Sequence, residues 1–149
     1  MKNLFNQTDV DEILKRIEKL KPGSQRQWGK MNAAQMITHC NKSLETAMGK
    51  NVIKPLFIGG IIGHIIKKSA YNEKPFGKNS PTDKSYKFNA DSDFEQGKSN
   101  AMASVKEFFQ GGASKCTVHP HPFFGHFTPE QWAIFQWKHL DHHLRQFGL

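Results

Sequence analysis

The chain has 149 residues, of which 37% are hydrophobic and 23% charged, a balance that excludes both a disordered chain and a bundle of membrane helices. Its 21 basic and 13 acidic side chains give a net charge of +8, which admits an anionic partner without identifying one. The two cysteines, Cys40 and Cys116, form no CxxC unit, and the sequence has no signal-peptide pattern and no membrane-length apolar run. We therefore expect one soluble, cytoplasmic domain over residues 1–149 that does not enter a membrane.

The first two predicted helices lie in the N-terminal third of the chain. Residues 9–20 are expected to form the first, because Asp9 and Glu12 make a capping-box pattern and apolar residues recur at helical spacing. Asn32 is expected to begin the second helix, with Gln35 as the reciprocal cap. The apolar stripes predicted to face the core are Val10, Ile13, Leu14, Ile17 and Leu20, and then Ala33, Met36, Ile37, Cys40, Leu44 and Ala47.

The middle of the chain gives a weaker pattern. Residues 55–70 predict a buried short helix or an apolar loop, because three glycines and many β-branched residues interrupt the helical spacing. Within this stretch, His64 is expected to be packed or interfacial, and the isoleucine-rich residues 57–66 offer a surface for a homodimer. Residues 71–90 are rich in Asn, Lys, Pro, Ser and Gly, which predicts a long crossover connection.

Two more helices are predicted in the C-terminal half. Ser92 followed by Glu95 indicates a third helix that runs to about Gly111. Thr128 is the expected N-cap of a fourth helix that spans 129–147. The third helix is expected to turn inward Phe94, Ala101, Met102, Val105, Phe108 and Phe109. Four helices with a long crossover between the second and third predict an all-α four-helix bundle.

Three histidines on two of these helices suggest a metal site. His139 and His143 are four residues apart and project from one face of the fourth helix, and such a pair can bind one divalent metal ion through neutral nitrogens. Taken alone, the pair is more often coincidence or two satisfied core histidines. His39, on the second helix, supplies a third ligand and leaves a position for water or substrate. Its expected polar flank, read as a pocket wall, is Asn32, Gln35, Ser43 and Thr46.

Other polar residues are expected to support this site. His142 lies at the rim of the same helix face, about 60° from His139, and is the candidate catalytic residue, as a proton carrier or a hydrogen-bond partner. Gln35 and Gln146 are candidates for orienting ligands. The loop of residues 119–126, HPHPFFGH, is expected to be structural, with its aromatic side chains covering one end of the bundle.

Two segments resemble the DinB-like (YfiT-like) superfamily of four-helix-bundle metalloenzymes. The first is WGKMNAAQMITHC, residues 28–40, and the second runs from HPFFG through TPEQW to HLDHHLRQ, residues 121–146. The resemblance follows the helix order of most of the chain but not residues 50–90. It implies one divalent ion, such as nickel or zinc, held by His39, His139 and His143. Some members of that superfamily are transferases or isomerases that use a low-molecular-weight thiol.

These observations predict a metal-dependent enzyme, a thiol S-transferase or a hydrolase, that acts on a small molecule. The first alternative is a metal-binding or interaction protein without enzymatic activity. The second is a weak nucleic-acid binder, because lysines alternate with aromatic residues over 67–88, although Glu73 and Asp83 interrupt the run and favour a solvated connection. The residues in question are Lys67, Lys68, Lys74, Lys78, Lys84 and Lys87, with Tyr71, Phe76, Tyr86 and Phe88.

Overall fold

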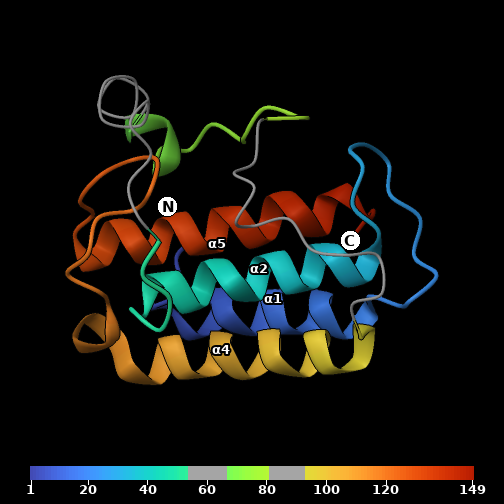
Figure 1. The fold of residues 1–149 in the computed structure, drawn as a ribbon, viewed down its shortest axis with the longest axis horizontal. Helices are drawn as coiled ribbons and strands as arrows, with labels where there is room; N and C mark the ends of the chain where they lie inside the picture. Colours follow the sequence, from blue (N-terminus) through green and yellow to red (C-terminus); the bar gives the residue numbers. More distant parts are fainter. Residues whose placement is uncertain (54–66, 81–92) are drawn as a thin grey trace.

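Four long helices make up the described part of the fold (Figure 1). The computed structural model describes residues 1–53, 67–80 and 93–149, and these ranges contain no strand. The all-α prediction is therefore confirmed. The helices are α1 (Gln7–Lys19), α2 (Ala33–Ala47), α4 (Phe94–Lys115) and α5 (Pro129–Gln146).

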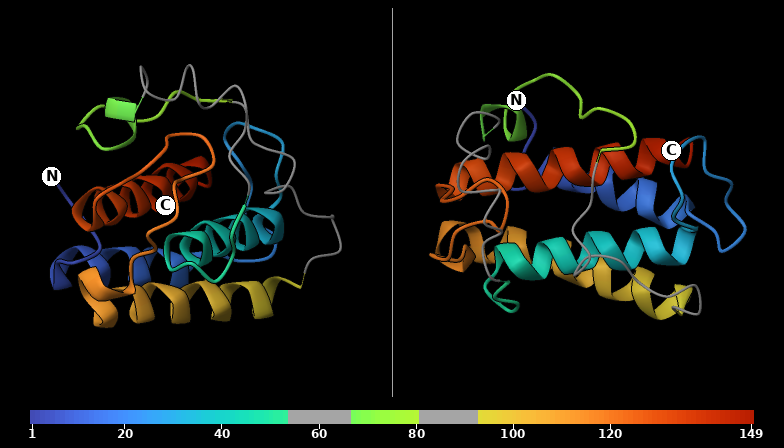
Figure 2. Two further views of the ribbon diagram at one scale, coloured as in Figure 1. Left: turned by 60° about the vertical axis from the view of Figure 1, so that its left-hand side comes forward. Right: turned by 45° about the horizontal axis from the view of Figure 1, so that its top comes forward.

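The axes of the four helices lie roughly parallel to one another, without regard to chain direction, and each helix packs mainly on two others (Figures 1 and 2). Both α1 and α2 pack against α4 and α5, and the interface between α2 and α4 is the most extensive. Although α1 and α2 follow each other in the chain, they lie diagonally opposite each other in the bundle. As neighbours, α2 and α5 bring their inward faces together, which is the condition for a site shared between them.

The N-terminal caps of α2 and α5 are those that the sequence predicts. Asn32 and Thr128 each accept a hydrogen bond from the backbone N–H three residues on, and Gln35 and Gln131 return the bond to the cap backbone. These reciprocal pairs satisfy N–H groups that a helix start otherwise leaves without a partner. These caps therefore define the residue at which each of the two helices that carry the candidate site begins.

The predicted N-cap of the first helix is wrong by three residues. The N-cap is Asn6, whose side chain accepts from the Asp9 N–H, so α1 begins at Gln7. Asp9 instead lies in the first turn, where its carboxylate accepts from the Asn3 N–H and where a negative charge favours the helix dipole. Asn is as good a cap as Asp, and the earlier cap gives the longer helix.

The third predicted helix also starts elsewhere than expected. Asp93, not Ser92, is the N-cap of α4, and it accepts from the Gln96 N–H at 3.0 Å. Helical geometry is broken at Gly112, whose φ of 55° and ψ of −147° lie outside the helical region, and a short helical turn continues to Lys115. The expected end near Gly111 coincides with this break.

The predicted apolar stripes form the core. Every member of the α2 stripe is buried, and so are most members of the α1 and α4 stripes, while Leu14, Met102 and Phe109 pack at its edge. Removing these side chains from water is the main stabilising contribution to such a bundle. The largest fully buried apolar side chains are Leu4, Ile13, Ile17, Leu20, Met36, Ile37, Leu44, Phe108, Trp132, Leu140 and Leu144.

Residues 67–80, which we call the cover segment, lie outside the bundle along α5 (Figures 1 and 2). The buried ammonium of Lys138 anchors this segment by donating to the backbone oxygens of Ser69 and Asn72, at 2.7 and 3.0 Å, and to the Asn72 side chain at 2.9 Å. The rest of the predicted crossover, together with His64 and all of the isoleucine-rich residues 57–66, lies outside the described residues. No helix in the described ranges combines the length and apolar character that a membrane span needs.

Candidate metal centre

Three imidazoles from two helices converge inside the bundle. His39 comes from α2, and His139 and His143 come from adjacent turns of α5, so that one ligand nitrogen from each lies within 4.8 Å of the other two. The His39 and His139 Nε2 atoms are 2.9 Å apart. His39 is 5% exposed, His143 is 7% exposed and His139 is partly buried. Among the described residues, this is the one cluster of at least three His, Cys, Asp or Glu side chains able to share an ion.

Burial favours the neutral form of two members of the triad. Desolvation holds the pKa of His139 well below its usual range, and the nearby imidazoles of His143 and His39 lower it further. Desolvation likewise lowers the pKa of His143 well below its usual range, followed by repulsion from His39, against a small opposing effect of the hydrogen bond to Gln146. A neutral imidazole keeps a nitrogen lone pair, which is what a metal ion requires.

Gln146 fixes the tautomer of His143. The Nδ1–H of His143 donates to Gln146 Oε1 at 3.0 Å, and Gln146 Nε2 in turn donates to the Trp28 carbonyl at 2.7 Å. With the proton on Nδ1, the Nε2 lone pair of His143 is available to a ligand. Partners of this kind orient metal-binding histidines in other proteins. The expected orienting role of Gln146 therefore has a structural basis.

A glycine in the loop before α2 makes this arrangement possible. Gly29 has a φ of +79°, and a Cβ at that position would lie 2.3 Å from Gln146 Nε2. The backbone of residues 28 and 29 can therefore approach Gln146 closely only because residue 29 has no side chain. Neither Trp28 nor Gly29 was singled out from the sequence as part of the site, and a loop Gly beside an aromatic residue is too common to indicate one.

His142 borders the triad but does not belong to it. Its ring centroid is 5.1 Å from that of His143, 5.9 Å from Trp28 and 5.8 Å from Phe76. Burial lowers its pKa, with opposing effects of the Asp141 and Arg145 charges. This is the rim position that the sequence predicts, and its catalytic role stays a prediction.

The cover segment closes over the same region. Phe76 packs against His142 and against Phe135, whose ring stacks on His139 at a centroid distance of 5.7 Å. The Lys138 ammonium lies 4.5 Å from the centroid of the Phe76 ring. Sequence periodicity does not reveal Phe76 as a neighbour of the site, because the contact depends on how the connection folds back.

The polar residues predicted to flank His39 have hydrogen-bond partners in the described structure. The Gln35 side-chain oxygen accepts from the Asn32 N–H in the helix cap, and its orienting role at the triad stays a prediction. The Ser43 hydroxyl and carbonyl pair with the buried amide of Gln136, at 3.0 to 3.2 Å. The Thr46 hydroxyl donates to a backbone carbonyl one turn back. Each of these side chains thus has a partner within the bundle, and the pocket wall stays a prediction.

Residues 119–126 have the structural role that was expected. His121 Nδ1 accepts from the N–H groups of Phe123 and Phe124 at 3.0 and 3.2 Å. Its ring is packed among aromatic side chains, and burial lowers its pKa to about 3. The rings within 6 Å of it belong to Phe124, Phe127, Trp132 and Phe135.

The cysteines take no part in the centre. Both are free thiols. Burial raises the pKa of the Cys40 thiol strongly, and burial together with Glu130 raises the pKa of the Cys116 thiol to about 11. Neither is a thiolate near neutral pH, and a thiolate is the form that binds metal.

The described part of the basic connection gives no support to nucleic-acid binding. The Tyr71 ring lies 6.0 Å from Phe127, and the Phe76 ring packs on Phe135, so both aromatic rings face the bundle. Lys67 donates to the His126 carbonyl. Bases could therefore not stack on these two rings without displacing them. The lysines and aromatic residues between 81 and 92 lie outside the described residues.

Comparison with known proteins gives one match. A family model described as "Protein of unknown function (DUF1569)" matches residues 2–148. No curated protein and no solved structure matches the chain. The matched range includes all four long helices and all three histidines of the triad.

Proposed function

The chain belongs to the DUF1569 family, and we propose that it is a DinB-like metalloprotein in which His39, His139 and His143 hold one divalent ion, nickel or zinc. We propose further that the ion takes part in a reaction of a small molecule, either S-transfer with a low-molecular-weight thiol or hydrolysis. The observation that carries the proposal is the convergence of three imidazole nitrogens within 4.8 Å at the α2–α5 interface.

The residues present fit such an ion. Three nitrogen ligands suit zinc or nickel, and three protein ligands are the usual number when a position is kept for water or substrate. The tautomer of His143 is fixed by Gln146, and burial disfavours the protonated forms of His139 and His143. Protonation, the main competitor of a metal ion for these nitrogens, is thereby weakened.

A bound divalent ion lowers the pKa of a water or thiol that it coordinates, which supplies a nucleophile near neutral pH. In an S-transfer, the thiol loses its proton and its sulfur bonds to the electrophilic carbon. The leaving group departs with the electron pair of the broken bond and takes up a proton. Phe76 and Trp28 would limit the access of water to this region. His142, at the rim, is the side chain placed to hydrogen-bond the reacting molecule.

The metal content of protein purified without a histidine tag tests the proposal. We expect about one equivalent of divalent metal by elemental analysis in the wild type and in His119→Ala, which removes an exposed histidine outside the triad. His39→Ala and His139→Ala are expected to lose it. Equal metal content in all four proteins would overturn the proposal.

Turnover separates an enzyme from a metal-binding protein without activity. The wild-type protein, loaded with nickel or zinc, would be screened with low-molecular-weight thiols and with carbon electrophiles and esters. We expect metal-dependent turnover that His139→Ala abolishes. Stoichiometric metal without turnover would favour the alternative of a non-enzymatic metal-binding protein.

A further inference from the structure

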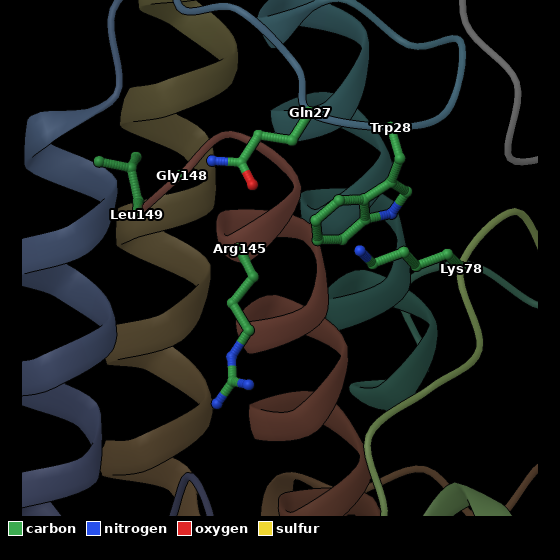
Figure 3. A pocket seen from close by; sticks show the side chains of 6 residues that line it. All are labelled: Gln27, Trp28, Lys78, Arg145, Gly148 and Leu149. Atoms are coloured by element: carbon green, nitrogen blue, oxygen red, sulfur yellow. The ribbon is translucent and has the colours of Figure 1, made fainter.

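A pocket of about 410 Å³ opens at the C-terminal end of α5 (Figure 3). It is formed by the loop before α2, the cover segment and the last residues of the chain, which are far apart in the sequence. The residues that line it are Gln27, Trp28, Lys78, Arg145, Gly148 and Leu149.

The charge of this pocket is positive. Of its six lining residues, two carry cationic side chains and none carries an acidic one. Arg145 shares the Asp141 carboxylate with Arg16 from α1, so a single carboxylate faces two guanidinium groups. The Leu149 carbonyl oxygen accepts from Arg16. The Arg145 side chain remains 60% exposed, which leaves it accessible to a ligand.

Lys78 and Trp28 form the second half of the pocket. The Lys78 ammonium lies over the Trp28 ring, 4.5 Å from the centroid, and Lys78 is exposed. None of the described salt bridges includes Lys78. An ammonium beside an aromatic ring face offers an anion a charge and offers an attached apolar group a flat contact surface.

The pocket adjoins the histidine triad through Trp28. The Trp28 ring contacts His142. The backbone carbonyl of Trp28 accepts a hydrogen bond from Gln146, and Gln146 in turn accepts one from His143. The pocket is nevertheless built from residues other than the triad, so its ligand can be tested without a metal ion.

We propose that this pocket binds a small organic carboxylate. The carboxylate lies at Lys78 and Arg145, and the apolar body of the molecule packs against the Trp28 ring. Two cationic side chains without an acidic one in the lining disfavour cationic ligands, and the aromatic surface favours an organic anion over an inorganic one.

Titration of the purified full chain with sodium benzoate, followed by ¹H–¹⁵N NMR of the tryptophan indoles, tests this proposal. The Trp28 indole signal is assigned by its loss in Trp28→Phe. Its N–H is buried without a hydrogen-bond acceptor in the described part of the chain, so it reports a new neighbour. The Trp132 and Trp137 indoles, which do not line the pocket, serve as internal controls.

We expect benzoate to shift the Trp28 signal saturably, while benzamide, which has the same ring and no charge, leaves it in place. Lys78→Met is expected to weaken benzoate binding roughly fivefold. Lys74→Met, which removes another exposed lysine of the cover segment, is expected to bind as the wild type does. An unmoved Trp28 signal, an equal response to benzamide, or wild-type affinity in Lys78→Met would each overturn the proposal. Because the readout is at Trp28, the result does not depend on whether the triad binds metal.

Discussion

Two hydrogen bonds in series set the orientation of His143. Gln146 accepts from its Nδ1–H and donates to the Trp28 carbonyl, and Gly29 leaves the space in which that carbonyl comes close. The ligand nitrogen of a helix residue is therefore controlled by a loop more than one hundred positions away in the sequence. Partners of this kind typically change metal affinity 10- to 100-fold when they are lost.

Gly29→Ala should weaken metal binding without changing a ligand. Its Cβ would displace Gln146, which lies within 2.3 Å of that position, and His143 would lose its partner. We expect a roughly 10- to 100-fold rise in the dissociation constant for zinc, measured by competition with a chromophoric chelator. Gly125→Ala is the matched control, because Gly125 has a similar φ of +74° but open space at its Cβ. Equal effects of the two substitutions would show that backbone strain alone is responsible.

His142 and His143 are adjacent histidines for which we expect opposite results. His143→Asn should lose the metal, because His143 supplies one of the three converging nitrogens. His142→Asn should retain one equivalent, because His142 lies outside that group. Elemental analysis of the two purified variants decides the matter. Loss of metal from His142→Asn alone would exchange the two roles.

The position of the cover segment on α5 depends on one buried cation, the Lys138 ammonium. Lys138 is 7% exposed, and burial lowers its pKa, yet its ammonium reaches three oxygens of Ser69 and Asn72. A buried ammonium without such acceptors would be strongly unfavourable. The same segment then places Phe76 on His142 and Lys78 over Trp28. Lys138 thus connects α5 to the segment that borders both sites.

Lys138→Met should loosen the cover segment and leave the rest of the bundle protected. We expect faster amide hydrogen exchange over residues 69–80 and a loss of about 1–3 kcal/mol in the free energy of unfolding. Lys98→Met is the matched control, because the Lys98 ammonium also binds two backbone carbonyls, those of Glu18 and Leu20, but away from this segment. Unchanged exchange over 69–80 in Lys138→Met would contradict the anchoring role.

The helix limits show where sequence reasoning succeeds. At Asn32 and Thr128, both members of a reciprocal cap are present and no competing cap lies nearby, and the predicted starts are confirmed. At the first helix, Asp9 with Glu12 matches the reciprocal cap pattern, but Asn6, three residues earlier, is also a favourable N-cap residue, and the structure has the cap at Asn6. A local pattern predicts a boundary only when it has no local competitor.

Part of the candidate site could likewise be predicted from the sequence, and part could not. The i, i+4 spacing placed His139 and His143 on one inward face, and the bundle prediction placed His39 opposite them. The first inference rests on helix geometry, and the second rests on the expected bundle and on the resemblance to the DinB-like superfamily. The parts that were missed, Trp28 and Phe76, lie in connections, where position follows from tertiary contacts that have no period in the sequence.

The free energy of unfolding of the protein should depend on pH through His121. Its pKa is about 3 in the folded protein and near 6.5 when unfolded, so between these values the unfolded chain binds a proton that the native state does not. The contribution of His121 to the free energy of unfolding is therefore fully present above pH 6.5 and is lost progressively as the pH falls below that value. The loss from this group alone is about 2 kcal/mol at pH 5.

Urea unfolding at pH 7.5 and pH 5 measures this effect. His121→Asn retains a side-chain acceptor for the Phe123 and Phe124 N–H groups but does not titrate. We expect the difference in unfolding free energy between the two pH values to be about 2 kcal/mol smaller in this variant. An identical difference in both proteins would show that His121 does not stay neutral in the fold.

The charge of the molecule has a smaller part in its chemistry than the net value of +8 suggests. Several lysines have structural partners, such as Lys67 at the His126 carbonyl and Lys138 at the cover segment. The function we propose rests instead on three histidines, and the only anion site proposed is a single pocket. The chemistry that we propose for the triad therefore lies inside the bundle and not on its surface.

X-ray absorption at the zinc edge of the zinc-loaded protein tests whether His39, His139 and His143 bind one ion together. A site formed by His39, His139 and His143 predicts three imidazole nitrogens at about 2.0–2.1 Å, with the multiple-scattering pattern of histidine rings and one further light-atom ligand. A spectrum with sulfur in the first shell, or with oxygen ligands and fewer than two imidazoles, would show that these three histidines do not form the metal site.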